Sequence, residues 1–69
     1  MKISARNAFT GKVKTVEMGA VNAEVVIEIA PGVEIASILT KKSFEGLGLE
    51  QGKEATVFIK ASSVMVAVD

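Results

Sequence analysis

Three short segments of the sequence are rich in hydrogen-bond donors and contain no carboxylate: residues 4–7 (Ser-Ala-Arg-Asn), 40–43 (Thr-Lys-Lys-Ser) and 60–63 (Lys-Ala-Ser-Ser). Their cations are Arg6, Lys42 and Lys60, and their hydroxyl donors include Ser4, Thr40, Ser43 and Ser62. A tetrahedral dianion needs donors and positive charge on every side. Taken singly, each segment is more typical of a strand end, a helix cap or a turn. Taken together, they predict an oxyanion site.

Catalytic chemistry has few candidates in this chain. It contains no histidine and no cysteine, so the usual acid–base group near neutral pH and the usual thiolate nucleophile are both missing. Glu17, Glu24, Glu28 and Glu34 are expected to form a solvent-facing surface, and no aspartate-rich loop offers a hard-cation site. We therefore expect the protein not to be an enzyme and to coordinate no metal ion through its own side chains.

The elements that must position these residues are mostly strands. Residues 21–29 alternate between apolar and polar side chains, which predicts a half-buried strand. The β-branched run at residues 11–17 predicts a second strand, and residues 18–20 would join the two as a hairpin. Pro31-Gly32 predicts a turn before a third strand at residues 33–40.

The second half of the chain adds a helix and two further strands. Thr40 can cap a short helix that ends at Gly48, and strands are expected at residues 55–60 and 64–68. The last strand has apolar residues on both sides, so we expect it to be covered on both faces. The order predicts a single all-β domain over residues 1–69, a five-stranded OB-like Greek-key barrel with one short helix between strands 3 and 4.

Length and composition predict self-association. A chain of 69 residues has a small core, because a domain of about this size buries only about 60 % of its unfolded surface. No disulfide can reinforce it, yet 49 % of the residues are hydrophobic. We therefore expect a homo-oligomer, with a tightly packed monomer as the alternative.

Charge and hydropathy exclude other partners. Eight basic and eight acidic residues cancel, and only three phenylalanines could stack on bases, so neither nucleic acid nor a membrane surface is expected to bind. No apolar run has the length of a signal peptide or a membrane span, which predicts a cytoplasmic protein.

Four motifs carry a resemblance to a known family. Residues 1–7 (Met-Lys-Ile-Ser-Ala-Arg-Asn), 21–25 (Val-Asn-Ala-Glu-Val), 47–52 (Leu-Gly-Leu-Glu-Gln-Gly) and 59–65 (Ile-Lys-Ala-Ser-Ser-Val-Met) resemble the molbindins. These are Mop-type, transport-associated OB (TOBE) domains. The resemblance covers essentially the whole chain, with the motifs in order and at the family's spacing.

The resemblance implies an OB-like barrel assembled as a hexamer, a trimer of dimers, that binds molybdate or tungstate between subunits for molybdenum storage or homeostasis. One subunit would contribute Ser4, Arg6, Lys60 and Ala61, and its neighbour Thr40, Lys42 and Ser43. The family has a second class of site near the three-fold axes, for which Asn22, Ser62 and Ser63 are only candidates. Two alternatives stay open: a binding module for another oxyanion or a molybdopterin-type cofactor, and a structural oligomerisation domain.

Overall fold

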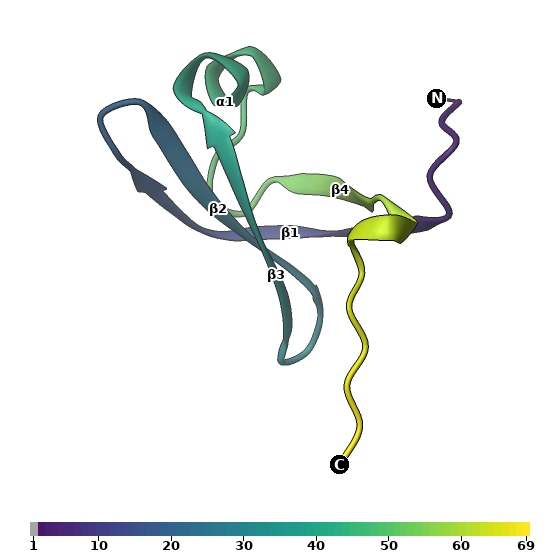
Figure 1. Ribbon diagram of the computed structural model, residues 1–69. Helices are drawn as coiled ribbons and strands as arrows, with labels where there is room; N and C mark the ends of the chain where they lie inside the picture. Colours follow the sequence, from purple (N-terminus) through teal and green to yellow (C-terminus); the bar gives the residue numbers. More distant parts are fainter. Residues whose placement is uncertain (1) are drawn as a thin grey trace.

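A computed structural model describes residues 2–69 as one curled antiparallel sheet with a short helix at one end (Figure 1). The elements are β1 (Asn7–Met18), β2 (Asn22–Ala30), β3 (Val33–Thr40), α1 (Lys41–Leu47), β4 (Glu54–Ile59) and the 3-10 turn η1 (Ala61–Ser63). The strand order in the sheet is β3-β2-β1-β4. None of the helices in these residues has the length and apolar character to cross a membrane.

Strand β1 is longer than the sequence predicts because it pairs with two other strands. Its second half pairs with β2 as the expected hairpin, and its first half pairs with β4, from Asn7 opposite Ile59 to Lys12 opposite Glu54. The register of the β1–β2 pair shifts between Val13 and Thr15, which is the signature of a bulge. A bulge bends the strand and increases its twist, so the sheet can curl between its two partners.

The β2–β3 hairpin follows the sequence closely. Gly32 adopts the positive φ of 75° that the turn requires. The inward residues of β2 face those of β3, as in the pair Ile27 and Ile35. The predicted strand at residues 33–40 is confirmed over its full length.

Helix α1 has both of its predicted caps. The Thr40 hydroxyl accepts a hydrogen bond from the Ser43 amide at 3.1 Å, and Gly48 is left-handed with φ 63° and donates its amide to Glu45 O at 3.1 Å. The helix rests against the sheet through Phe44, which packs on the core.

The core lies on one face of the curled sheet and is small. Val13, Ala23, Val25 and Ile27 are the buried hydrophobic residues of the described chain. Partly buried side chains from α1, β3 and β4 pack around them. Four buried residues make a small core, as expected for a domain of about this length.

The predicted fifth strand at residues 64–68 is wrong for the single chain. Residues 64–69 are extended, belong to no strand of the described sheet and lead away from it (Figure 1). The reason is the turn at η1, which directs the chain outward instead of back along β4. Residues 2–69 are therefore mostly β with one short helix and four paired strands, and they do not close the five-stranded Greek-key barrel.

Candidate oxyanion site

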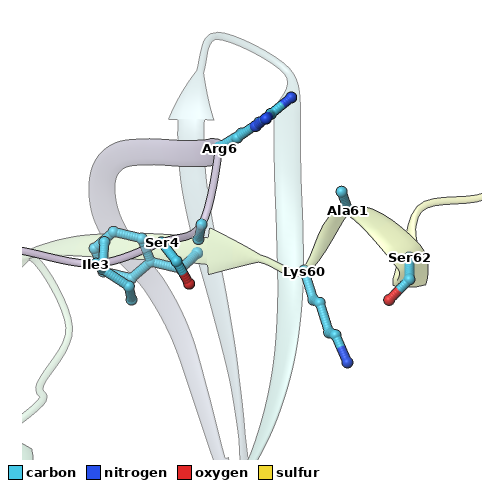
Figure 2. Close-up of a pocket in the computed structure, with 8 residues that line it drawn as sticks. Ile3, Ser4, Arg6, Lys60, Ala61 and Ser62 are labelled. Atoms are coloured by element: carbon cyan, nitrogen blue, oxygen red, sulfur yellow. The ribbon is translucent and has the colours of Figure 1, made fainter.

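An open cavity of about 590 Å³ lies where the N-terminal segment meets the end of β4 and η1 (Figure 2). Its lining combines hydroxyl donors and cations with apolar side chains, and comprises Ile3, Ser4, Ala5, Arg6, Phe58, Lys60, Ala61 and Ser62. No carboxylate belongs to it. An oxyanion would meet donors and positive charge here without a repelling negative group.

The pairing of β1 with β4 creates this cavity. Asn7 begins β1 and lies opposite Ile59, the last residue of β4, and the Asn7 Nδ2 donates to Ile59 O at 3.2 Å across 52 positions of sequence. The residues just before β1 and just after β4 must therefore be neighbours. Two of the three donor-rich segments meet for this reason.

The turn η1 gives the second segment its shape. Lys60 caps the turn, the Ser63 amide donates to Lys60 O at 2.8 Å, and the Val64 amide donates to Ala61 O at 3.2 Å. These bonds hold Lys60, Ala61 and Ser62 in a compact arc at the cavity wall.

The two cations of the cavity do not converge within one chain. Figure 2 shows the Arg6 and Lys60 side chains extending in different directions from the cavity wall. Both residues are exposed, and among the described residues no carboxylate forms an ion pair with either one. Their charge is available to a ligand, but a single chain does not surround that ligand.

The third donor-rich segment lies elsewhere. Thr40, Lys42 and Ser43 are at the start of α1, away from η1 (Figure 1), and none of them lines the cavity. The Thr40 hydroxyl donates to Ser43 Oγ at 3.0 Å as part of the helix cap. The structure thus brings together Ser4, Arg6, Lys60 and Ala61, four of the seven predicted site residues, and separates the other three from them.

The cavity is also lined by residues that are not among the seven predicted site residues. Ser62 belongs to the donor-rich segment 60–63, so a signal for it was present. Ala5 likewise lies within the donor-rich segment 4–7, whereas Ile3 and Phe58 lie outside the three segments and only the β1–β4 pairing reveals them. Asn22 and Ser63, candidates for a second class of site, do not line this cavity. The described residues contain no group of three or more histidine, cysteine or acidic side chains that could hold a metal ion.

Comparisons with known proteins identify the class. The family model described as TOBE domain matches residues 3–66. A probable molybdenum-pterin-binding protein of Haemophilus influenzae is 51% identical over 69 residues, covering 100% of both chains. MopII from Clostridium pasteurianum superimposes with a TM-score of 0.90 at 46% identity, covering 97% of this chain and 100% of MopII.

A structure with bound ligand is also similar. The cytoplasmic molybdate-binding protein ModG, solved with molybdate bound, matches with a TM-score of 0.89 and 51% identity, over 94% of this chain and 46% of the ModG chain.

The chain belongs to the TOBE domain family, a class of small β domains. Within that family it is a Mop-type protein, a molbindin, as its resemblance to that group implies. The Haemophilus influenzae relative and ModG are both named for what they bind.

Proposed function

We propose that this protein binds molybdate, and tungstate by the same chemistry, as an intracellular store that buffers molybdenum. It acts in the cytoplasm as a single-domain binding protein and not as an enzyme. The carboxylate-free cavity at Ser4, Arg6, Lys60 and Ala61 supports the proposal most directly. The similarity to ModG, whose structure contains molybdate, supports the choice of ligand.

The site is completed by a second subunit. Four predicted residues line the cavity of one chain, and Thr40, Lys42 and Ser43 lie at the start of its α1. In the assembly that we propose, a hexamer built as a trimer of dimers, α1 of a neighbouring subunit supplies these three residues to the open side of the cavity. The divergence of Arg6 and Lys60 in Figure 2 favours a ligand held between chains.

Binding rests on charge-assisted hydrogen bonds. Arg6, Lys42 and Lys60 donate from cationic groups, and each such bond contributes about 1.5–3 kcal/mol when it is shielded from water. Serine and threonine hydroxyls and free backbone amides satisfy the remaining oxygens. Sulfate carries the same charge as molybdate, so discrimination between them depends on the size of the enclosed cavity.

Titration calorimetry tests the proposal with molybdate, tungstate, sulfate and phosphate against the purified full chain, after elemental analysis for molybdenum and tungsten. We expect saturable binding of molybdate and tungstate, with sulfate and phosphate competing only at far higher concentration. Absence of heat with molybdate, together with absence of either metal from the purified protein, would contradict the proposal.

A molybdopterin-type cofactor is the second candidate, because the Haemophilus influenzae relative is named for binding molybdenum-pterin. The cavity would then hold the anionic end of a larger molecule. Ultraviolet absorption and fluorescence of the purified protein separate the two candidates. Inorganic molybdate adds no pterin signal, whereas a bound pterin does.

A further inference from the structure

Asn7 and Ile59 form the last pair of the β1–β4 ladder, at the end that borders the oxyanion cavity. The Asn7 Nδ2 donates to Ile59 O at 3.2 Å. Among the side-chain hydrogen bonds of residues 2–69, this one is partly buried and the others are exposed. Neither residue is among those that line the cavity. The Asn7 amide is therefore partly shielded from water and next to the site, but it is not placed to touch a ligand.

The ends of the ladder lead directly into the site. Arg6 precedes Asn7, Lys60 follows Ile59, and both cations lie outside the strands. No hydrogen bond or ion pair among residues 2–69 holds Arg6 to another residue. An N-terminal segment is poorly ordered unless a contact ties it down. The bond between Asn7 and Ile59 is the nearest such contact to Arg6.

We propose that Asn7 is a positioning residue of the oxyanion site: its amide holds the start of β1 on the end of β4 and thereby fixes Arg6 relative to Lys60. The inference rests on the proposed function, because it concerns the same site. When the bond opens, the ladder can fray from this end and the donors of the N-terminal segment move away from Lys60. Only the closed fraction of molecules then binds an anion, so the apparent dissociation constant rises as that fraction falls.

The strength of one hydrogen bond sets the size of this effect. The net contribution of a single neutral hydrogen bond corresponds to a change of about threefold to tenfold in an equilibrium constant. The coupling is also reciprocal: if the Asn7 bond strengthens anion binding, a bound anion must stabilise the Asn7 bond by the same factor. The two directions of the coupling can be measured separately.

The first test compares Asn7→Ala with Thr10→Ala by calorimetry with molybdate. Thr10 is the matched control because its hydroxyl forms a cross-strand hydrogen bond with Thr56 Oγ1 at 3.2 Å in the same strand pair, and Thr10 does not line the cavity. We expect Asn7→Ala to lower molybdate affinity about threefold to tenfold, and Thr10→Ala to change it by less than about twofold. Equal affinities of the two variants overturn the inference.

A double-mutant cycle with Arg6→Ala separates positioning from a general loss of structure. Once the guanidinium is absent, holding position 6 in place has little further value for the anion. We therefore expect the effect of Asn7→Ala to shrink to about twofold or less in the Arg6→Ala background. A general loss of structure would lower the affinity by the same factor in both backgrounds, so full multiplication of the two effects overturns the positioning role.

The second test uses the unmutated protein and does not depend on how a variant folds. The exchange of side-chain amide protons with water is measured by NMR, with and without saturating molybdate. We expect the Asn7 amide to exchange about threefold to tenfold more slowly when molybdate is bound. The amide of Gln51, an exposed residue in the turn before β4, is the control and should keep its rate. An Asn7 amide whose exchange is unchanged at saturation overturns the inference.

The inference and the proposed function fail in different ways. If the unmutated protein gives no heat with molybdate, the proposed ligand is wrong and the role of Asn7 falls with it. If the unmutated protein binds molybdate and Asn7→Ala binds it equally well, the oxyanion site stands and the role of Asn7 is wrong.

Discussion

Arg6 is the only arginine of the chain, and its exposed guanidinium lies at the wall of the candidate site. We expect Arg6→Ala to lower molybdate affinity by about one to two powers of ten, because one or two charge-assisted hydrogen bonds are lost. Lys12→Ala is the matched control, since it also removes one exposed cation but lies outside the cavity. Calorimetry on both variants measures the effect, and equal affinities would remove Arg6 from the site.

Among the glycines of the described residues, Gly11 makes the closest approach to neighbouring backbone, at Glu28 O. A Cβ there would be 2.8 Å from Glu28 C and 2.9 Å from Ile29 Cα, both of which belong to the β2 backbone. We expect Gly11→Ala to lower the free energy of unfolding by about 1–3 kcal/mol, as overpacking does. Urea unfolding followed by circular dichroism measures this loss.

Gly46 provides the control for that substitution. A Cβ at Gly46 would meet nothing within 4 Å, and the residue lies within α1. Gly46→Ala should therefore raise the free energy of unfolding by about 0.5–1 kcal/mol. A loss of similar size in both variants would show that steric contact at Gly11 is not the cause.

At the scale of elements, the Thr40 cap determines where α1 begins. Its hydroxyl accepts the Ser43 amide at 3.1 Å, so Thr40→Ala leaves that amide without its partner. We expect a loss of about 1 kcal/mol in the free energy of unfolding, measured in urea without anion, while Thr40→Ser retains most of it. If serine is as destabilising as alanine, the hydroxyl is not what stabilises the helix start.

A charge cluster spans three strands on the outer face of the sheet. Lys14 of β1 contacts Glu34 of β3 and lies 3.8 Å from Glu28 of β2. The hydrogen bond with Glu34 and the charge of Glu34, followed by the charge of Glu28, raise the pKa of Lys14 above its ordinary value.

The sign of the pH effect follows from the raised pKa. The cluster contributes stability fully at pH below the pKa of an unfolded lysine, and the contribution is lost as pH rises through the higher pKa of the folded state. We expect Glu34→Gln to return the pKa of Lys14 toward its ordinary value in an NMR titration. Glu45→Gln on α1 is the control and should leave the pKa of Lys14 unchanged. If Glu34→Gln does not change the pKa of Lys14 either, Glu34 is not the cause of the raised pKa.

At the scale of the whole molecule, the oxyanion cavity and an apolar groove lined by Val25, Leu39 and Val57 share one lining residue. Phe58 of β4 lines both of them. A ligand that binds only the assembled protein must stabilise the assembly, by about 2.7 kcal/mol per site at a hundred times its dissociation constant.

We therefore expect molybdate to shift the dissociation of the oligomer to lower protein concentration and to raise its thermal unfolding temperature. Sedimentation at decreasing protein concentration, with and without molybdate, measures the shift. Sulfate at equal ionic strength is the control. Identical dissociation in both salts would show that anion binding and assembly are independent.

Local features of the fold could be predicted from the sequence because each depends on a few neighbouring residues. The alternation in residues 21–29 indicated β2, and Pro31-Gly32 indicated the turn before β3. Thr40 and Gly48 marked the limits of α1 because capping involves residues within one helical turn. The donor-rich composition of segments 4–7, 40–43 and 60–63 was likewise visible, since it is a property of side-chain types alone.

Contacts between distant residues were decided only by the tertiary structure. Pairing of β1 with β4 extended β1 to Asn7 and placed Arg6 and Lys60 on the wall of one cavity, which no local pattern indicates. The same holds for residues 64–68, whose apolar pattern is that of a strand but whose place in a sheet depends on a partner edge. Side-chain alternation is a property of each segment alone, whereas strand pairing depends on which backbone edges the folded chain brings together.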